Sequence, residues 1–538
     1  MLRHLTIALV LIFLSACGGG TSTPTEETPT EETPTEETPT EELPPTEELP
    51  PTVPLGLADV VVIVTNTDYQ TMDGFGATTL SLVWGTGLGN TLTNSQRQRA
   101  IEAVYQDVGI NLGGLEAATP NDLFGASSGY MEPVNDDNDP LNFNWSNFNT
   151  LGSDDMKSSL VDLAEPLGFS DYYLASKVNS NWGSPWLETL RGDDYNAYIA
   201  EAAELVAAMP IYWRDNFGIS PRLISPMNEP LNGNVELKAG ADKGDLVDII
   251  KAAGLRLTNE GFTDVKFIVP ASETEQRSYD EATAILADPD ARQYVGVIAY
   301  HPYPYGSKYA GISPILSTSG SGNPDPGRIA VRESLRDLGA AYGIPLWMTE
   351  VSNGGVDVRS FDGLRARAIH IHDELKYANA SAYFGMNNMW DLTSQRAHFG
   401  NDDIYGSRSE GSIVVINNDT DEVVITGMGY AIGHYARWIK PGAVRIDAQA
   451  DDALVLVSAF RDEAQERRLV LVAINNSSSE REIEFQLDGV EVTGTITGEQ
   501  STTDGAWQPL AAASVVSANR VRATVQPLSV TTLSIARP

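Results

Sequence analysis

The chain has 538 residues, and 42% of them are hydrophobic, which is enough to build several sizeable cores. Its 35 lysine and arginine residues are outnumbered by 73 aspartate and glutamate residues, so the formal charge is −38 at pH 7. A protein this acidic is repelled by phosphate backbones and by anionic lipid, which argues against a nucleic-acid-binding protein and a polybasic membrane protein. The single cysteine, Cys17, excludes an internal disulfide and a cysteine-based zinc site.

The first 16 residues have the pattern of a secretory signal peptide. A short basic start precedes the apolar run 7–14, which is too short to cross a membrane as a helix. The run ends in Leu14-Ser-Ala-Cys17, which resembles a bacterial lipobox, the motif in which the cysteine is acylated and becomes the mature N-terminus. We therefore expect a lipid anchor at Cys17, and Gly18 after it is typical of retention in the outer membrane of the cell envelope. An ordinary signal peptide that happens to contain a cysteine is the alternative.

Residues 17–52 are predicted to be a lipid-anchored linker. From residue 23 the unit Thr-Pro-Thr-Glu-Glu recurs, and it then loosens into Leu-Pro-Pro-Thr-Glu-Glu. Regularly spaced prolines block helix and sheet, and paired glutamates repel one another, so we expect an extended, solvated and disordered segment. Most acidic residues nevertheless lie after residue 52, so the negative charge belongs mainly to the folded part.

Strands and helices alternate between residues 71 and 440, a pattern typical of parallel βα units. The expected helices are residues 95–108, 195–217, 243–260, 325–342 and 363–379. The expected strands are residues 74–82, 109–112, 172–177, 222–225, 265–270, 295–300, 346–349 and 380–387. Eight such strands predict a catalytic (β/α)8 barrel over residues 71–440.

The pattern changes after residue 440. The expected strands there are residues 453–459, 468–474, 482–487, 490–496, 520–525 and 531–534, with no helical pattern between them. Residues 441–538 are therefore predicted to form a β-sandwich. The β-branched segment 60–65 needs a sheet to pair with, so residues 53–70 are expected to add a strand to this side domain. The predicted fold class is α/β, a TIM barrel with an attached C-terminal β-sandwich.

Two glutamates follow predicted barrel strands. Glu229 comes just after the fourth strand, and Glu350 ends the seventh. Active sites of such barrels lie at the carboxyl ends of the strands, so the two carboxylates are expected to face each other across the mouth of the barrel. Hydrolysis of a glycosidic bond needs such a pair. One carboxyl protonates the leaving oxygen and the other attacks the anomeric carbon, at a separation of about 5 Å for net retention.

Four short motifs follow one another along the chain. They are Asp73-Gly-Phe-Gly-Ala77, Ser225-Pro-Met-Asn-Glu-Pro230, Trp347-Met-Thr-Glu350 and the segment 429–442. Together they resemble the first-strand, acid/base, nucleophile and final-helix motifs of glycoside hydrolase family 30, a group of retaining (β/α)8 glycosidases. The resemblance runs from about residue 58 to the end of the chain. It implies that Glu229 is the acid/base and Glu350 the nucleophile, with no metal or organic cofactor.

The resemblance also implies a set of substrate-binding residues: Asn228, Trp182, Trp186, His301, Tyr303 and Trp390. Asn228 is expected to hydrogen-bond the sugar 2-hydroxyl. His301 and Tyr303 lie near the nucleophile in this interpretation, and Tyr303 orients it. Apolar sugar faces stack on aromatic rings, so Trp390 is expected to floor the −1 sugar, with Trp182 and Trp186 as further platforms. Packing in the core or in loops is the alternative for the three tryptophans.

The chain departs from the family at two places. Many relatives carry an arginine after the second strand, whereas this chain reads Asn111-Leu-Gly-Gly-Leu-Glu116. Glu116 is either a residue of the site floor or a structural residue. The Tyr/Arg loop with which glucuronoxylan-specific members hold a uronic acid is also missing, and Arg396 is the nearest candidate cation. An acidic protein without an arginine clamp favours neutral glycans.

Three other patterns are set aside. Residues 125–129 fit a serine nucleophile elbow, but no apolar strand leads directly into them. His370 and His372 are two apart on a predicted helix and point to different faces, unlike a zinc-binding pair. Residues 135–139, Asn-Asp-Asp-Asn-Asp, are acidic enough to attract calcium but lack the glycine and closing glutamate of a calcium loop, so a surface turn is expected.

These observations predict a surface-tethered, monomeric, retaining β-glycoside hydrolase that acts on plant or algal polysaccharide of the xylan or β-glucan type. The same chemistry on β-1,6-glucan, β-1,6-galactan or small β-glucosides and xylosides is one alternative. A non-catalytic glycan-binding surface lipoprotein is an alternative of another class. The presence of both carboxylates and Asn228 counts against that second alternative.

Overall fold

The computed structural model of the chain describes residues 57–79, 92–115, 132, 134–137, 139–176, 186–230, 243–303, 326–352, 357, 359–405, 411–463 and 466–538. All of them belong to one structural unit, Leu57–Pro538. The signal sequence, Cys17, the linker, Glu116, Trp182 and the 125–129 motif lie outside the described residues. Among the described residues, the structure contains no helix with the length and apolar character that crossing a membrane requires.

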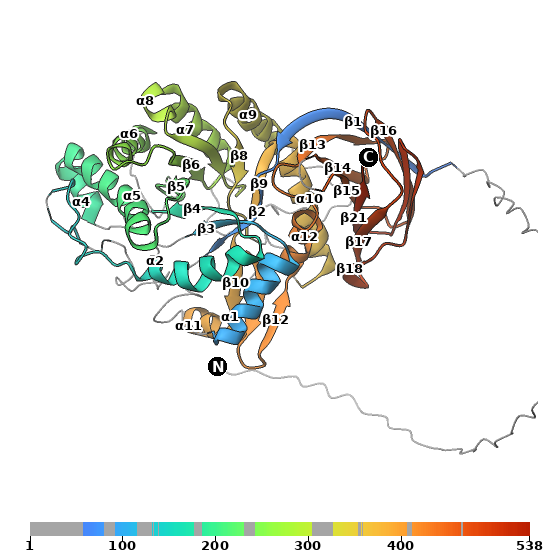
Figure 1. Cartoon of the computed structure of the whole chain (residues 1–538), viewed down its shortest axis with the longest axis horizontal. Helices are drawn as coiled ribbons and strands as arrows, with labels where there is room; N and C mark the ends of the chain where they lie inside the picture. The colour runs from blue at the N-terminus through green and yellow to red at the C-terminus, as the bar shows by residue number, and fades with distance from the viewer. Residues whose placement is uncertain are drawn as a thin grey trace, which may run out of the picture. The chain divides into compact units, whose positions relative to one another are not determined.

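Eight parallel strands close into a barrel (Figure 1). In order around the barrel they are β2 (Gly74–Thr79), β3 (Leu112–Leu115), β4 (Asp171–Ala175), β5 (Leu223–Ser225), β6 (Lys266–Ser272), β7 (Val295–Tyr300), β8 (Leu346–Met348) and β9 (Ala380–Gly385). The last strand closes on the first, with Ala382 opposite Gly74. The predicted (β/α)8 barrel is therefore confirmed.

Helices cover the outside of the barrel (Figure 1). They are α1 (Asn94–Ile101), α2 (Leu151–Met156), α3 (Asp162–Ala164), α4 (Trp186–Asp193), α5 (Tyr195–Phe217), α6 (Lys243–Asn259), α7 (Glu275–Ala287), α8 (Pro289–Arg292), α9 (Pro326–Tyr342), α10 (Phe361–Tyr377) and α12 (Gly427–Ala436). Helix α11 (Leu392–Phe399) instead packs on two strands outside the barrel, Asn387–Asp391 and Ser412–Asn417. Short π-helical and 3-10 segments extend α1 and flank α3. Helix α5 has the predicted bounds because Asp194 caps its first amides and Gly218, at φ 70°, ends it.

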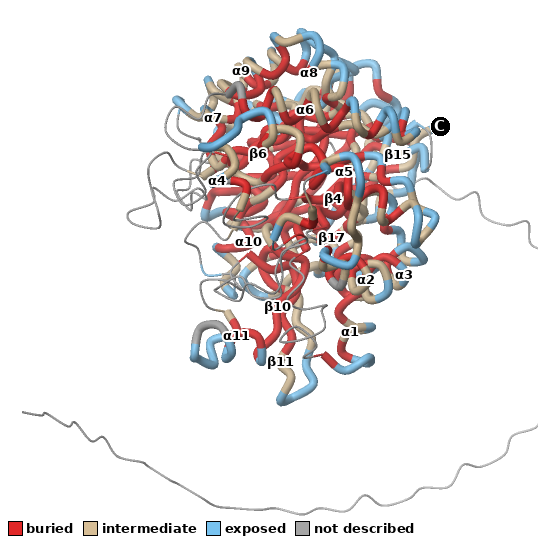
Figure 2. Tube along the Cα trace, turned by 90° about the vertical axis from the view of Figure 1, so that its left-hand side faces the viewer, coloured by how far each residue is buried: buried red, intermediate tan, exposed pale blue. Residues whose placement is uncertain are grey.

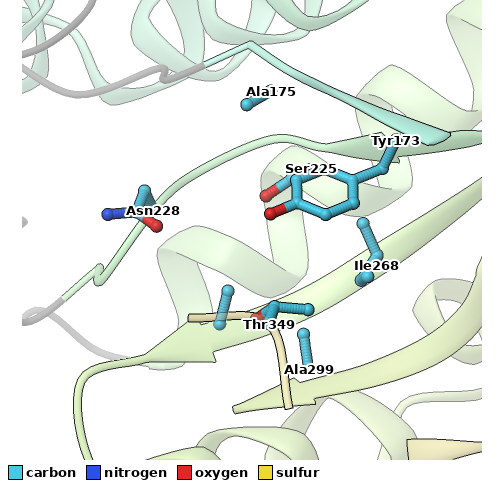
Figure 3. Close-up of a pocket in the computed structure, with 8 residues that line it drawn as sticks. Tyr173, Ala175, Ser225, Asn228, Ile268, Ala299 and Thr349 are labelled. Atoms are coloured by element: carbon cyan, nitrogen blue, oxygen red, sulfur yellow. The ribbon is translucent and has the colours of Figure 1, made fainter. Parts of the chain in front are cut away.

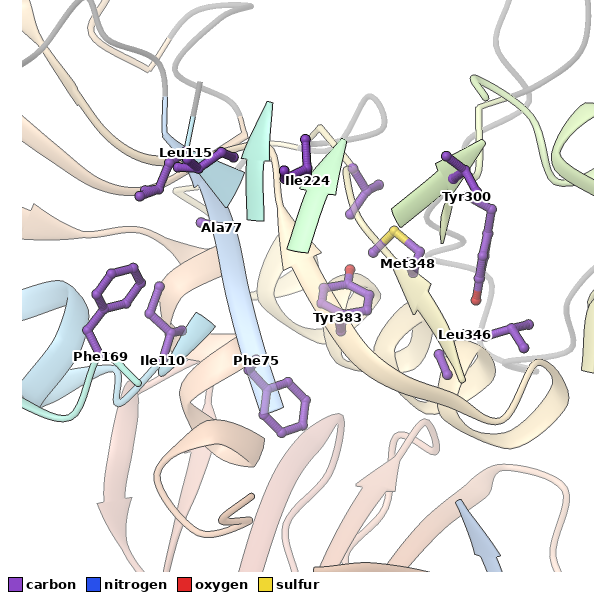
Figure 4. Packing of buried hydrophobic residues seen from close by; sticks show 14 of the residues in the cluster. Phe75, Ala77, Ile110, Leu115, Phe169, Ile224, Tyr300, Leu346, Met348 and Tyr383 are labelled. Atoms are coloured by element: carbon purple, nitrogen blue, oxygen red, sulfur yellow. The ribbon is translucent and has the colours of Figure 1, made fainter. Parts of the chain in front are cut away.

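The barrel interior is filled unevenly. At one level Trp347 stacks on Phe384, with ring centroids 5.6 Å apart. A Cβ on Gly76 would lie 2.6 Å from the Phe384 ring, so this strand needs glycine there. Elsewhere the interior holds small residues such as Ala175, Ala271 and Ala299, which leave space below the carboxyl ends of the strands. The outer faces of the strands pack against the helices in a separate, larger core (Figure 4).

Ten strands form a single sheet beside the barrel. Their order is β18 (Gly505–Pro509), β17 (Ile496–Thr502), β21 (Ser529–Ala536), β15 (Arg468–Asn475), β14 (Val455–Asp462), β13 (Val444–Ala450), β1 (Val60–Thr71), β16 (Arg481–Asp488), β20 (Arg520–Val525) and β19 (Ala512–Ser517). The early strand β1 pairs antiparallel with β13 and parallel with β16. It therefore joins the C-terminal sheet although it precedes the barrel in sequence.

The two halves of this sheet share one core. Residues of β14, β15 and β21, such as Leu471 and Leu533, belong to the same buried cluster as residues of β1, β16 and β20, such as Val62 and Phe485. Strands β20 and β21 contact each other although they are far apart in the sheet order. The side domain is thus one continuous sheet that bends around its core rather than two separate sheets.

The other face of this sheet packs on the barrel. Phe460, Val470 and Val472 lie in the large core that surrounds the barrel. Three buried histidines line this part of the protein: His372 contacts Ser458, His434 contacts Thr532, and His370 contacts Tyr383. Burial lowers the pKa of His370 to about 4 and that of His372 and His434 to about 3, so all three are neutral at ordinary pH. The prediction that His370 and His372 point to different faces is confirmed.

Several expected element bounds are wrong for identifiable reasons. Residues 490–495 are not a strand; Val490 and Val492 are buried in an irregular connection before β17. The second barrel strand runs over Gly113 and Gly114 rather than ending at Leu112, because the Asn111 side chain bonds the backbone of Asp73 and Phe75 at its start. A further three-stranded sheet, β10 (Asn387–Asp391), β11 (Ser412–Asn417) and β12 (Glu422–Ile425), was not predicted.

Candidate active site

Four predicted site residues follow the carboxyl ends of three barrel strands. Glu229 follows β5, His301 and Tyr303 follow β7, and Glu350 follows β8. One carboxylate oxygen of Glu229, one of Glu350 and one ring nitrogen of His301 all lie within 4.8 Å of one another. The His301 side chain is 2% exposed and that of Glu229 is 13% exposed. The barrel thus brings two partly accessible carboxylates and an imidazole together at its mouth.

Glu229 is held by a backbone conformation that L-residues rarely adopt. Its φ is 48°, in the left-handed region, and its amide donates to the carbonyl of Ala271 at 2.9 Å. Ala271 itself has a φ of 55° near the end of β6. Two such residues in contact are costly and persist only where the surroundings fix them, which is typical of functional sites. The strain therefore directs the Glu229 side chain toward the barrel mouth.

His301 is the partner of Glu229. Its Nδ1 lies 2.9 Å from Oε1 of Glu229, and its own amide donates to the carbonyl of Ser272 at 3.0 Å. The imidazole is almost fully buried, so its contact holds the Glu229 carboxyl in place from one side.

Glu350 has a different partner. The Tyr303 hydroxyl donates to Oε1 of Glu350 at 3.0 Å and accepts a hydrogen bond from the Ser352 amide at 3.1 Å. Burial, together with the nearby charges of Glu350 and Glu229, raises the pKa of Tyr303 well above its usual range. Tyr303 therefore remains a donor, and a carboxylate that accepts its hydrogen bond is favoured in the ionised form.

Behind this pair lies Arg367 of α10, which was not among the predicted site residues. It donates to the Tyr383 hydroxyl at 3.0 Å and to the carbonyl of Ser352, the residue whose amide bonds Tyr303. The guanidinium is buried, with the residue only 1% exposed. The only sequence signal for it is its place among the apolar residues of a predicted helix, where a charged side chain is unusual.

A pocket lies inside the barrel beneath these side chains (Figure 3). Its lining residues are Tyr173, Ala175, Ser225, Asn228, Ile268, Ala271, Ala299 and Thr349. Asn228, next to Glu229 in the chain, therefore lines the pocket, and its role in binding the substrate stays a prediction. The other polar side chains of the lining, Tyr173, Ser225 and Thr349, come from β4, β5 and the end of β8.

The remaining predicted residues lie elsewhere. Trp390, on β10, is 1% exposed and donates its indole N–H to Gln395 at 2.9 Å, so in this structure it is a core residue with no ring face open to a sugar. Trp186 begins α4, is partly buried, and donates to the carbonyl of Glu132 at 3.2 Å. Arg396 is exposed and bonded to two carboxylates, those of Asp402 and Asp419. It is therefore already neutralised by its neighbours.

Two kinds of chemistry are open to the three converging groups. Two carboxylates and an imidazole within 4.8 Å are a donor set that a divalent transition-metal ion can use. The same separation is close to the 5–5.5 Å of the carboxyl pair in retaining glycosidases. Each carboxylate has its own partner, His301 for Glu229 and Tyr303 for Glu350. The two carboxyl groups thus have different surroundings, which acid/nucleophile chemistry needs.

Comparisons with known proteins agree with the sequence motifs. The xylanase Xyn30A of Clostridium acetobutylicum, from glycoside hydrolase family 30 subfamily 8, matches with a TM-score of 0.59 at 19% identity, covering 88% of this chain and 99% of that one. The chain has the family 30 fold. An endo-β1,6-glucanase, BT3312, shares it with a TM-score of 0.60 at 18% identity, covering 90% of this chain and 96% of that one.

The match by sequence covers a smaller part of the chain than the match by structure does. Glucuronoxylanase XynC of Bacillus subtilis (strain 168) is 26% identical over 230 residues, which is 42% of this chain and 43% of that protein. The chain thus matches less than half the length of this curated relative. No protein-family model matches the chain.

Proposed function

We propose that this protein is a retaining β-glycoside hydrolase. The observation that carries the proposal is the pair of glutamates at the mouth of the barrel, with carboxylate oxygens within 4.8 Å of each other and a separate hydrogen-bonding partner for each. At this separation the second carboxylate is close enough to attack the sugar directly, whereas an inverting enzyme needs a wider gap for a water molecule.

Each partner supports one step of the proposed reaction. Glu350, ionised and oriented by Tyr303, attacks the anomeric carbon while Glu229 transfers its proton to the leaving oxygen, so the glycosidic bond breaks and a glycosyl–enzyme ester forms. Glu229 then accepts a proton from water, which attacks the same carbon and releases Glu350. His301 holds Glu229 in place through both steps and can share its proton.

The substrate class follows from the charges of the described residues and from the named relatives. We propose a neutral plant or algal β-glycan of the xylan or β-glucan type, with β-1,6-linked glucan or galactan and small β-glycosides as alternatives. The relatives include xylanases, a glucuronoxylanase and a β-1,6-glucanase. Arg396, the cation weighed for a uronic acid, is already bonded to Asp402 and Asp419, which supports a neutral sugar.

The proposed location is the outer membrane of the cell envelope. A lipid on Cys17 and the extended linker 17–52 would tether a monomeric enzyme to the membrane while the barrel reaches its glycan. Labelling with radioactive palmitate should mark the wild-type protein and not Cys17→Ser. Equal labelling of both would refute the anchor without touching the proposed catalysis.

Substitution of the two glutamates tests the catalytic proposal. Glu350→Gln should abolish turnover, because a neutral amide cannot form the ester. Glu229→Gln should lose most activity on natural glycans but retain the first step on an aryl β-glycoside whose leaving group needs no proton, and this difference appears as a burst of product. Proton NMR should show the β-anomer first. Undiminished activity of Glu350→Gln, or release of the α-anomer first, would refute the mechanism.

The same experiments separate an enzyme from the glycan-binding alternative. A binding protein would retain xylan or β-glucan in affinity electrophoresis with no reducing ends released by the wild type. Product analysis on xylan, β-1,3- and β-1,6-glucan, galactan and ulvan-type polymers then assigns the linkage.

A further inference from the structure

The segment from Tyr300 to Tyr303 carries the partners of both proposed catalytic glutamates. Its histidine contacts the proposed acid/base, and its second tyrosine donates to the proposed nucleophile. Two backbone hydrogen bonds hold the segment against the end of β6. The His301 amide donates to the carbonyl of Ser272, and the Tyr303 amide donates to that of the following residue, each at 3.0 Å. A displacement of this segment would therefore move both partners at once.

The peptide group that joins Pro302 to Tyr303 is bonded at both ends. Its N–H donates to the Glu273 carbonyl at 3.0 Å, and its C=O accepts a hydrogen bond from Nη1 of Arg328, on α9, at 2.8 Å. A trans peptide group is planar and directs its C=O and N–H to opposite sides, so two such bonds fix the orientation of the plane. This plane leads directly into Tyr303, and its orientation sets the direction of the tyrosine side chain.

Arg328 is itself held by a series of charged side chains, which we call the α9 network: Arg328, Glu275, Arg332 and Glu374. Nη1 of Arg328 donates to Oε1 of Glu275 at 3.2 Å. Arg332, one turn further along α9, contacts the same oxygen at 3.4 Å and Oε1 of Glu374 at 2.5 Å. The side chains of Arg332 and Glu374 are 2% and 0% exposed. The network therefore runs from the Pro302 carbonyl into the core between α9 and α10.

The far end of the α9 network returns to the same segment. The Tyr300 hydroxyl donates to Oε2 of Glu374 at 2.7 Å. Tyr300 lies in the core that surrounds the barrel, with its ring directed away from β7 (Figure 4). Burial opposes the charge of Glu374, but Arg332 and the hydrogen bonds from His370 and Tyr300 outweigh it and lower the pKa of Glu374 below its usual range. The acceptor is thus a carboxylate, which makes the bond to Tyr300 a strong one.

We propose that the α9 network positions the partners of the two proposed catalytic glutamates, an inference that rests on the proposed glycosidase function. Arg328 acts through the Pro302 carbonyl, and Glu374 acts through the Tyr300 hydroxyl. Both are positioning residues, because they act on the segment that carries His301 and Tyr303 and not on the sugar. Desolvation offsets much of the attraction in a buried ion pair, so the network should contribute more to the geometry of this segment than to the stability of the fold.

Kinetics of Arg328 variants test the proposal on xylan or β-1,6-glucan, whichever the wild type cleaves. Arg328→Met removes the donor to the Pro302 carbonyl and should lower kcat on the order of tenfold with KM within about twofold, because a misplacement of about 1 Å can cost about 100-fold in rate and a smaller shift is expected here. Arg328→Lys keeps a cationic donor and should recover part of the lost kcat. The control Arg336→Met, on the same helix, breaks exposed ion pairs with Glu333 and Asp337 and should behave as the wild type.

Amide hydrogen exchange followed by mass spectrometry observes the segment without using catalysis. Peptides that contain residues 301–303 should exchange at least about tenfold faster in Arg328→Met and in Tyr300→Phe, whereas peptides from the side domain should exchange as in the wild type. Tyr300→Phe removes one oxygen and leaves the core filled, so it keeps the test decisive if Arg328→Met does not fold, and its kcat should also fall. Its control is Tyr212→Phe, which removes a similar bond, to Asp154 at 2.8 Å, from another part of the barrel wall.

Three results would overturn the proposal. The first is a wild-type kcat in both Arg328→Met and Tyr300→Phe, and the second is wild-type exchange of residues 301–303 in both. The third is exchange that increases equally throughout the chain, which would make the α9 network a general stabiliser of the fold. The proposed function fails separately, through undiminished activity of Glu350→Gln, and in that case hydrogen exchange still decides whether the network fixes the segment.

Discussion

Replacement of Tyr303 by phenylalanine removes one oxygen that makes two hydrogen bonds at the proposed nucleophile. The hydroxyl donates to Glu350 at 3.0 Å and accepts the Ser352 amide at 3.1 Å. A hydrogen bond to a charged group contributes about 1.5–3 kcal/mol. If that energy acts on the ionised nucleophile in the transition state, kcat/KM should fall about 10- to 100-fold. Losing the donor also disfavours the ionised form, so the acidic limb of the pH profile should rise by about one to two pH units.

Initial rates on an aryl β-glycoside from pH 3.5 to pH 9 measure both effects. Tyr195→Phe is a suitable control, because Tyr195 also bonds carboxylates but does so at the N-terminal end of α5, with Asp245 and Asp248. The control should leave the profile unchanged. If Tyr303→Phe lost less than threefold in kcat/KM and its acidic limb did not move, Tyr303 would be a packing residue and the reasoning about Glu350 would be wrong.

Three further predictions concern the surroundings of the site. Arg367→Met removes the donor to the Ser352 carbonyl and should lower kcat about tenfold with little change in KM. Arg367→Lys should restore part of the lost kcat. An unchanged kcat in Arg367→Met would refute the link between Arg367 and the nucleophile. Trp347→Phe removes the 2.7 Å bond to Asp73 inside the barrel and should destabilise the fold by about 1.5–3 kcal/mol in urea unfolding, and a loss below 0.5 kcal/mol would contradict this. The melting temperature should fall between pH 6.5 and pH 8, because burial raises the pKa of Glu132 to about 8 and that of Glu204 to about 9, so both carboxyls keep protons on the folded chain that the unfolded chain has released. Calorimetry would contradict this by showing a flat or rising profile.

The barrel could be predicted because its elements obey local rules. Helix α5 has a capping aspartate at one end and a glycine at the other, and β7 is a short apolar run between turns, so the sequence places both within a residue. The carboxyl ends of such strands converge by topology alone. That is why Glu229, His301, Tyr303 and Glu350 could be placed at one mouth without knowing any distance.

Residues whose role depends on the fold around them could not be placed in this way. Trp390 is an aromatic residue of the kind that stacks on sugars, but it lies on β10 of the unpredicted three-stranded sheet and is buried there. Val490 and Val492 have the alternation of a strand, yet they fill the side-domain core from an irregular connection. In both cases tertiary packing decided between two states that the local pattern left equal.

The acidic segment 135–139 shows the same limit. It was expected to be a surface turn, but Asp136 is buried, and Glu201 and Glu204, which lie near it, come from a helix more than 60 residues later in the chain. A local motif search cannot find carboxylates that packing brings near one another. The net charge of −38 does not predict this burial either, because it does not distinguish buried carboxylates from solvated ones.

The two proposed catalytic glutamates each have a side-chain partner, but Glu229 carries a backbone restraint as well, and the difference bears on the mechanism. Glu229 is bonded by His301 and is also fixed through its backbone, which is left-handed and bonded to Ala271, itself left-handed. Glu350 is fixed through its side chain, by Tyr303. A nucleophile must move toward the anomeric carbon as the ester forms, and a side-chain hydrogen bond permits that movement. A general acid that acts twice, in opposite directions, benefits from a fixed position. The strain at Glu229 is therefore placed where rigidity serves the reaction, and the softer restraint is placed where motion does.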